Sequence, residues 1–498
     1  MFESADLDHK ISKEEYKREE PKLREALLNA QFDLGSLRKF PVLIIIGGVD
    51  GAGKGETVNL LNEWMDPRHI VTHAFGEASD EEAERPLMWR FWRAMPPKGK
   101  IGIFFGSWYT APIVHHVLGH TDDAELQANV DEIFRHEKML VDEGVLLLKF
   151  WFHLSKDQQK KRMKALEKDP VTSWRVTKED WRRLKHYDTF RSVSERVLRE
   201  TSTGGAPWVV VSGNDHRYRS LTVGRMLLDA MTKRVEETQL AEKGRAKAKR
   251  IDAAPPMPQL DNRALLRDMD LGLKLTKASY LKQLEKLQGQ LNVLSREQAF
   301  QQKSVILLFE GWDAGGKGSS IRRVTAALDA RHYGVVPVAA PTEEERAQPY
   351  LWRFWRHAPR KGRITIFDRS WYGRVLVERV EGFASVPDWM RAYGEINDFE
   401  EQLVVNGAVL MKFWLHLSKE EQYRRFKERE KTSFKRFKIT EEDWRNRKRW
   451  DEYETAVCDM VDRTSSEHAP WTLVEAEDKL YARIKILKTV VKRLEAVL

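Results

Sequence analysis

Short apolar runs alternate with charged, amphipathic stretches along the chain. In the second half, the spacing of charged and apolar residues between the runs is typical of helices with one buried face. Strand–helix alternation predicts an α/β fold, in which helices cover both faces of a parallel sheet. In such folds ligands bind at the carboxyl ends of the strands. The predicted strands of this half are residues 305–309, 335–338, 364–367, 408–417 and 472–475, and Pro337 weakens the second of these predictions.

The pattern occurs twice, at a constant offset of 263 positions. Residues 89–93 and 352–356 both read WRFWR, and residues 153–156 and 416–419 both read HLSK. A repeat this long indicates a duplicated domain rather than a solenoid. We therefore predict the same α/β domain in tandem. The predicted boundaries are an N-terminal domain at 1–235, a linker at 236–262 that ends in a Pro- and Ala-rich run, and a C-terminal domain at 263–498.

Each half contains a glycine-rich loop that follows an apolar run. The first loop reads GVDGAGKG at 48–55, and the second reads GWDAGGKG at 311–318. A loop of this spacing between a strand and a helix turns backbone N–H groups toward an anion, and its lysine adds a full charge. The residue after the lysine is usually Ser or Thr, which holds Mg²⁺, but here it is Gly55 or Gly318.

Two carboxylates of the second half are the predicted Mg²⁺ ligands in place of that hydroxyl. Asp313 lies within the loop, and Asp368 ends the predicted strand 364–367. Mg²⁺ is a hard cation that prefers oxygen ligands. Each aspartate alone also fits a structural role, Asp313 as a turn residue and Asp368 as a helix N-cap.

Composition and charge indicate which kinds of partner and which compartment suit this protein. The 498 residues are 41% hydrophobic and carry a formal charge of +9, with basic residues concentrated after the second loop. Such a field attracts polyanions, and nucleic acid, phospholipid and inorganic polyphosphate all qualify. No apolar run is long enough to span a membrane, the first 13 residues lack a signal-peptide core, and Cys458 is the single cysteine. These features predict a cytoplasmic protein.

The second half resembles the polyphosphate kinase 2 family. The resemblance rests on GWDAGGKG at 311–318, PTEEE at 341–345, YLWRFWR at 350–356 and FDRSWYGRVLVERV at 367–380, and it covers nearly all of residues 268–498. It implies a three-layer P-loop kinase fold with a helical lid. It also implies Mg²⁺-dependent phosphoryl transfer between inorganic polyphosphate and a nucleotide. Family members with two fused domains phosphorylate AMP to ADP, which makes AMP the expected acceptor.

The resemblance also implies roles for residues of the second half. Phosphoryl transfer depends mainly on in-line placement and charge neutralisation. We expect Lys317 to hold the donor phosphates, Asp368 to hold Mg²⁺, Asp313 to share the metal or orient the acceptor, and Arg369 to stabilise the phosphoryl group in transfer. The other expected phosphate-binding residues are Gly311, Gly316, Gly318, Ser319, Lys435, Arg436 and Lys438. The expected acceptor-side residues are Thr342, Arg353, Arg374, Glu378 and Arg379, of which Arg374 and Glu378 also fit an ordinary i,i+4 ion pair.

The first half lacks most of these residues at the matching positions. Asp368 corresponds to Phe105, Arg369 to Gly106, and Lys435 to Thr172. We therefore predict that the N-terminal domain is catalytically silent. It packs against the active half, helps to feed it polyphosphate, or keeps its loop only by ancestry.

Three other functions fit parts of the sequence. One is transfer to nucleoside diphosphates, another is an ATP-dependent nucleoside monophosphate kinase, and the third is a non-enzymatic polyanion scaffold. The acids Asp313 and Asp368 argue against the scaffold, because anion binding alone does not need them. No nucleic-acid-binding motif appears, so we expect neither nucleic acid nor membrane as a partner. The sequence leaves the base preference and the oligomeric state open, a homo-oligomer included.

Overall fold

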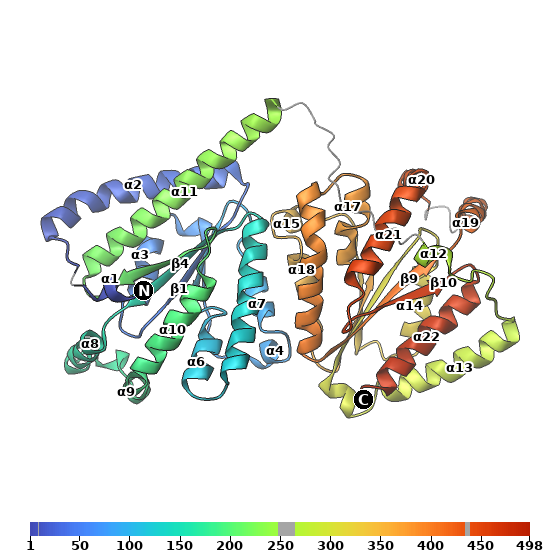
Figure 1. Ribbon diagram of the computed structural model, residues 1–498, viewed down its shortest axis with the longest axis horizontal. Coiled ribbons are helices and arrows are strands. Elements are labelled where there is room, and N and C mark those ends of the chain that lie inside the picture. Colours follow the sequence, from blue (N-terminus) through green and yellow to red (C-terminus); the bar gives the residue numbers. More distant parts are fainter. Residues whose placement is uncertain (8, 248–263, 434–438) are drawn as a thin grey trace. The chain divides into compact units, whose positions relative to one another are not determined.

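The computed structural model describes residues 1–7, 9–247, 264–433 and 439–498 (Figure 1). The chain divides into two compact units. Unit 1 consists of Met1–Ala78, Arg90–Ile251 and Pro341–Trp352, and unit 2 of Ser79–Trp89, Asp252–Ala340 and Arg353–Leu498. Most of the linker predicted at 236–262 lies outside the described residues, so the domain boundaries stay a prediction.

The first half alternates strands and helices along the chain. Its strands are β1 (Val42–Gly48), β2 (Ile70–Ala74), β3 (Ile101–Phe105), β4 (Leu146–His153) and β5 (Trp208–Ser212). Its helices are α1 (Glu3–Asp6), α2 (Lys13–Leu37), α3 (Lys54–Trp64), α4 (Asp80–Ala83), α5 (Met88–Arg93), α6 (Thr110–Val117), α7 (Asp123–Asp142), α8 (Lys156–Lys168), α9 (Lys178–Lys185), α10 (Tyr187–Thr201) and α11 (His216–Lys247), with 3₁₀ turns η1 (Pro67–His69) and η2 (Ser173–Arg175).

The second half repeats this order. Its strands are β6 (Ser304–Gly311), β7 (Tyr333–Pro337), β8 (Ile364–Asp368), β9 (Ala408–His416) and β10 (Trp471–Glu475). Its helices are α12 (Ala264–Arg267), α13 (Lys277–Leu294), α14 (Lys317–Thr325), α15 (Glu343–Arg346), α16 (Trp352–Trp355), α17 (Val377–Val380), α18 (Val386–Val405), α19 (Lys419–Lys431), α20 (Glu441–Lys448), α21 (Trp450–Thr464) and α22 (Lys479–Glu495), with 3₁₀ turns η3 (Ala299–Gln302) and η4 (Trp371–Arg374).

Each half forms one parallel five-stranded sheet. The strand orders are β2-β3-β1-β4-β5 and β7-β8-β6-β9-β10, which are the same topology. The predicted duplicated α/β fold is confirmed, and each predicted strand of the second half is present. Pro337 is the last residue of β7, an edge strand, where a missing N–H is tolerated.

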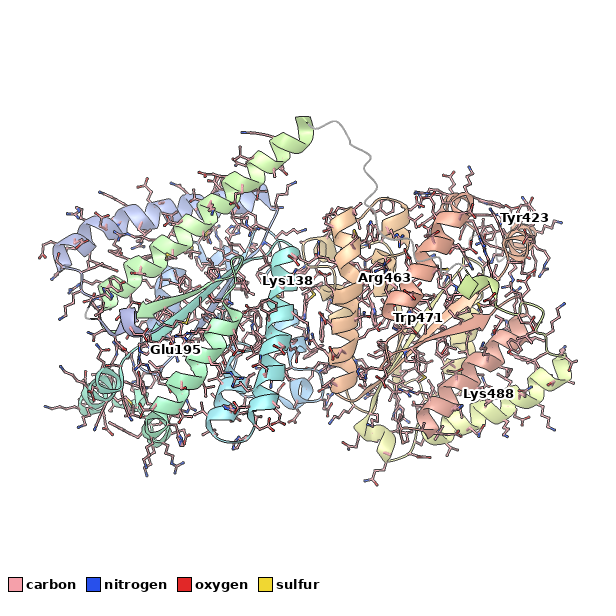
Figure 2. The ribbon with its side chains drawn as sticks, viewed as in Figure 1. Lys138, Glu195, Tyr423, Arg463, Trp471 and Lys488 are labelled. Carbon is pink, nitrogen blue, oxygen red and sulfur yellow. The ribbon has the colours of Figure 1, made fainter. Side chains whose placement is uncertain are left out.

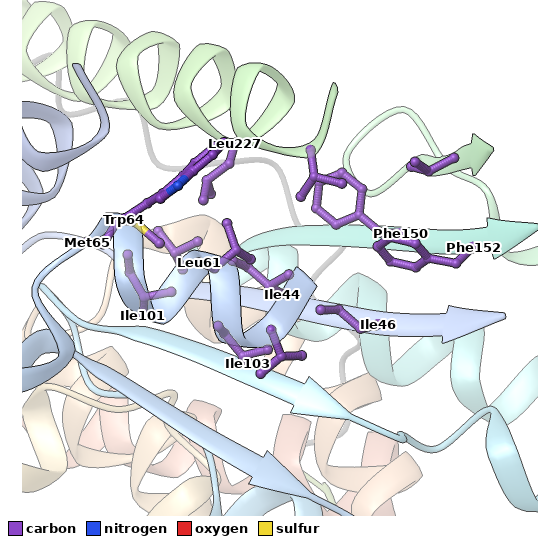
Figure 3. Packing of buried hydrophobic residues seen from close by; sticks show 14 of the residues in the cluster. Ile44, Ile46, Leu61, Trp64, Met65, Ile101, Ile103, Phe150, Phe152 and Leu227 are labelled. Carbon is purple, nitrogen blue, oxygen red and sulfur yellow. The ribbon is translucent and has the colours of Figure 1, made fainter. Parts of the chain in front are cut away.

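Apolar residues of the strands and flanking helices form the core of each half. In the first half, Ile44 and Ile103 from the sheet pack with Leu61 and Trp64 of α3 and Leu227 of α11 (Figure 3). In the second half, the corresponding cluster joins β6, β8 and β9 to α13, α14 and α22. Helices α2 and α11 lie side by side in Figure 1, as do α13 and α22. This packing fixes the helix that follows each glycine-rich loop against its sheet.

No helix in the described ranges combines the length and the apolar character needed to cross a membrane.

Candidate active site

The second glycine-rich loop joins β6 directly to α14. Gly316 is the N-cap of α14 with φ of 106°, a conformation that L side chains rarely adopt, so glycine is required where the chain turns into the helix. The Lys317 ammonium folds back over the loop and donates to the carbonyl oxygens of Gly311 at 2.6 Å and Trp312 at 3.3 Å. The loop therefore presents a helix N-terminus and a lysine at the same place.

Asp368 and Arg369 lie beside this loop because β8 is the neighbour of β6. The register pairs Phe309 with Asp368, which places Asp368 at the carboxyl end of the sheet. Arg369 follows with φ of 65°, a left-handed conformation that is strained for arginine. Its guanidinium donates to Asp313 Oδ1 at 3.1 Å. The site therefore brings the predicted catalytic residues of two strand ends together.

A cavity of about 620 Å³ opens over the loop. Eight cationic side chains and four carboxylates line it, so its lining carries a net positive charge. The cationic residues are Lys317, Arg322, Arg323, Arg369, Arg425, Arg429, Lys479 and Arg483, and the acidic residues are Asp313, Asp368, Glu428 and Asp443. Such a lining suits a ligand that carries several negative charges.

Burial and neighbouring charges shift the pKa values of the lining residues. Burial lowers the pKa of Lys317, and the charge of Asp313 partly opposes this shift. Burial also disfavours the charged form of Arg369, but the carboxylates of Asp313 and Glu310 outweigh it and raise the pKa of Arg369. Burial raises the pKa of Asp443, and the charge of Asp313 raises it further. The charge of Asp313 thus affects the pKa values of Lys317, Arg369 and Asp443.

Asp313 and Asp368 are the residues that could hold a divalent cation. Both line the cavity, and a Cβ atom on Gly318 would lie 3.8 Å from Asp368 Oδ2. The start of α14 at Gly318 therefore lies next to the Asp368 carboxylate. Within the described ranges, no three His, Cys, Asp or Glu side chains gather into a metal-binding group. Mg²⁺ commonly takes only one or two carboxylates and completes its shell with substrate phosphates and water, so the donor set fits this ion.

The structure brings most of the predicted phosphate-site residues together. The cavity lining contains the predicted residues Asp313, Gly316, Lys317, Gly318, Ser319, Asp368 and Arg369. Gly311 ends β6, and its φ of 146° lets the chain pass close to the carbonyl oxygen of Leu415. Lys435, Arg436 and Lys438 lie outside the described residues, so their predicted role stays a prediction.

The predicted acceptor-side residues lie apart from this cavity's lining, as far as the described residues define it. Thr342 caps α15 in a capping box with Glu345. Arg353 donates to the carbonyl oxygen of Ala339 at 3.0 Å. These contacts are structural, and they leave the expected acceptor roles of both residues untested.

The other three acceptor-side residues lie in or just before α17. Arg374 and Glu378 form the ion pair that their spacing suggested, at 3.2 Å, although Arg374 belongs to η4 rather than to the same helix. Arg379 pairs with Asp459 at 2.7 Å and donates to the Tyr393 hydroxyl at 2.8 Å. The roles of Arg374, Glu378 and Arg379 in acceptor binding stay predictions.

Six of the cavity's cations are not among the predicted site residues. They come in pairs from three helices, namely Arg322 and Arg323 of α14, Arg425 and Arg429 of α19, and Lys479 and Arg483 of α22. Two pairs are four residues apart, which places both members on one helix face. That spacing was a usable signal, but it did not reveal that α19 and α22 face the same loop.

The first loop has different surroundings. The Lys54 ammonium also folds back, donating to the Gly48 carbonyl oxygen at 2.5 Å and to Asp50 Oδ1 at 3.3 Å. The buried Arg219 guanidinium donates to the Ala52 carbonyl oxygen at 3.4 Å and to Glu56 Oε2 at 2.5 Å. Asp50 and Arg219 therefore contact groups of the first loop. Glu56 adds an acidic side chain in the first turn of α3.

Comparison with known proteins extends over the whole chain. The model of the family described as polyphosphate kinase 2 matches residues 10–239 and 274–497. The chain is 59% identical to the polyphosphate:AMP phosphotransferase of Pseudomonas aeruginosa, over 100% of this chain and 99% of the relative. It is 52% identical to the protein of the same name from Pseudomonas syringae pv. tomato, over 99% and 98% of the two chains. A crystal structure described as a polyphosphate kinase 2 from Pseudomonas aeruginosa superposes with a TM-score of 0.89 at 55% identity, covering 100% of this chain and 99% of that one.

Proposed function

The chain belongs to the polyphosphate kinase 2 family, and we propose that it transfers the terminal phosphoryl group of inorganic polyphosphate to AMP, giving ADP. Both full-length relatives reported above bear the name of this activity. The observation that carries the proposal is the cavity over the second loop, where six further cationic side chains line the same space as Lys317, Asp368 and Arg369. A chain of phosphates is the substrate that such a lining suits.

In the proposed reaction, the second half neutralises charge and holds the two substrates in line. An oxygen of the AMP phosphate attacks the terminal phosphorus of polyphosphate. The bond from that phosphorus to its bridging oxygen breaks, and polyphosphate leaves one unit shorter. The attacking oxygen is already anionic, so the reaction needs no strong general base. Lys317 and the N–H groups at the start of α14 bind the donor phosphates, and Arg369 stabilises the group in transfer.

Asp368 and Asp313 are the proposed ligands of Mg²⁺. When bound, the ion neutralises phosphate charge and orients the donor. The carboxylate of Asp368 faces the start of α14 at Gly318, which supports this role. Asp313 contacts Arg369 through one oxygen, so it also positions that guanidinium.

The N-terminal half is proposed to be catalytically silent. Its strand β3 ends in Phe105, at the register position that Asp368 holds in the second half, and Gly106 follows. A half without a metal carboxylate and without the transition-state arginine lacks two groups whose single loss commonly costs about 10²–10³ in rate.

The test is an ATP-free assay of the full-length protein. Polyphosphate is mixed with AMP, ADP, or another nucleoside mono- or diphosphate, with and without Mg²⁺, and the products are separated. We expect ADP from AMP in the presence of Mg²⁺ only. Lys317→Ala protein, prepared identically, controls for contaminating kinases. If ADP forms from AMP only when ATP is added, polyphosphate is not the donor and the proposal is refuted. Use of diphosphates alone would refute AMP as the acceptor.

A further inference from the structure

Asp313 of the second loop is held at both carboxylate oxygens. Arg369 donates to Oδ1 at 3.1 Å, and the side-chain amide of Asn446 in α20 donates to Oδ2, also at 3.1 Å. A carboxylate with one donor can rotate about its Cβ–Cγ bond, whereas two donors on opposite oxygens fix its plane. Asn446 does this through a neutral amide, so it adds no charge beside the carboxylate.

Asn446 is itself held by a polar chain. The Tyr453 hydroxyl of α21 lies 3.2 Å from Asn446 Oδ1 and 3.4 Å from Glu381 Oε1. Glu381 is only 7% exposed and also pairs with Arg445 of α20 at 3.0 Å. Because Glu381 caps the C-terminal end of α17, the contacts run from the phosphate loop through α20 and α21 to the helix that carries Glu378 and Arg379.

The first half contains none of these three side chains at the matching positions. Asn446 corresponds to Arg183, Tyr453 to Phe190, and Glu381 to Leu118. There, Arg183 lies 3.6 Å from Asp50, the counterpart of Asp313, as a solvent-exposed ion pair. The neutral amide contact therefore accompanies Asp368 and Arg369 and is absent where they are absent.

We propose that Asn446 is a positioning residue of the phosphoryl-transfer site, which fixes the carboxylate of Asp313 and is in turn held by Tyr453. The inference rests on the proposed function, in which Asp313 shares the metal or orients the acceptor phosphate. Loss of Asn446 lets Asp313 rotate and slows the transfer step. We expect donor binding to be little affected, because the contacts of Asn446 described above are to Asp313 and Tyr453 rather than to the cations of α14, α19 and α22.

The test measures kcat and KM of the full-length protein for AMP and polyphosphate. Asn446→Ala should lower kcat about 10-fold, the effect of one hydrogen bond to a charged group, and leave the KM for polyphosphate unchanged. Asn446→Asp should lower kcat more, because two carboxylates then face each other. Lys448→Ala changes an exposed residue of the same helix and should match the wild type in kcat, KM and thermal midpoint.

A double-mutant cycle tests the link to Tyr453. Tyr453→Phe should lower kcat less than Asn446→Ala does, and the double variant should equal Asn446→Ala, because both changes act through one contact. The positioning role is overturned if Asn446→Ala keeps wild-type kcat, if its kcat loss only tracks a lower thermal midpoint, or if the two changes are additive. An inactive wild type would instead overturn the proposed function, and this inference with it.

Discussion

The two halves of the chain share a buried polar network but differ around the phosphate loop. In the second half, Lys412 Nζ lies 2.7 Å from Glu400, 2.9 Å from the Tyr372 hydroxyl and 2.6 Å from the Thr464 carbonyl oxygen. Trp471, labelled in Figure 2, donates to the hydroxyl of the same threonine at 2.9 Å.

The first half has the same network, built from the residues 263 positions earlier. Lys149 Nζ lies 2.6 Å from Glu137 and 2.7 Å from the Thr201 carbonyl oxygen. The side chains of Lys149 and Lys412 are completely buried. A network that occurs both with and without Asp368 and Arg369 serves the fold rather than the proposed reaction.

The two halves differ in backbone strain beside the phosphate loop. Ala314 and Arg369 adopt φ of 61° and 65°, which is costly for residues with a side chain. Their counterparts are Gly51 and Gly106, both with φ of 80°, which glycine adopts readily. The backbone shape is therefore common to both halves, and the second half accepts strain at Arg369, where the guanidinium contacts Asp313.

The two halves also differ in the cationic residues around the loop. At the positions of Arg322, Arg323, Arg429, Lys479 and Arg483, the first half has Asn59, Leu60, Leu166, His216 and Ser220. Its loop is instead contacted by Arg219, which pairs with Glu56. Lys54 and Arg162, the counterparts of Lys317 and Arg425, remain cationic. With five of the eight lining cations replaced and Arg369 matched by Gly106, the first half is better suited to a structural role than to feeding polyphosphate to the active half.

The largest expected difference comes from the loop lysines. Lys317→Ala should lower ADP formation from AMP and polyphosphate by about 10³-fold, because it removes the positive charge proposed to bind the donor phosphates. Lys54→Ala, the matched change in the first half, should keep most of the activity. Steady-state rates of the two variants decide the comparison, and a larger loss in Lys54→Ala would reverse the assignment of the active half.

The buried lysines should instead behave alike. Lys412→Met and Lys149→Met each leave a buried glutamate without its partner, so each should destabilise its own half by about 3–5 kcal/mol. Denaturant unfolding, followed as separate transitions where they resolve, measures both. Glu400→Leu combined with Lys412→Met should cost less than Lys412→Met alone. If Lys149→Met costs little stability while Lys412→Met costs much more, the fold does not need the network, and it would serve the active site of the second half instead.

Arg369→Gly installs the first-half residue in the second half. We expect kcat to fall by about 10²-fold, because the cation proposed to stabilise the transition state is lost. Stability should stay equal or rise by up to about 1 kcal/mol, because glycine relieves the left-handed strain. Kinetics and urea midpoints measure the two effects. A parallel loss of stability would make Arg369 a structural residue.

The reverse change, Gly106→Arg, is the matched control. A Cβ atom at Gly106 would lie 2.7 Å from the Phe75 carbonyl oxygen, so this variant should lose stability and gain no activity.

The sequence alone was sufficient to predict the duplicated fold and the centre of the site. The constant offset of 263 positions requires one fold twice, and apolar runs mark strands wherever a parallel sheet is buried on both faces. The glycine-rich loop and the aspartate that ends β8 converge because neighbouring parallel strands end at the same edge. Local pattern and spacing therefore determine Lys317, Asp368 and Arg369 as one site.

Only the tertiary structure decided what surrounds that centre. Arg322, Arg429 and Lys479 are ordinary charged positions on three amphipathic helices, and nothing local distinguishes a cation that faces solvent from one that faces a phosphate loop. Asn446 likewise acquires its role because α20 packs where its amide reaches Asp313, 133 residues away in the sequence. Contacts between distant segments depend on how the helices pack, and that packing is a property of the whole fold.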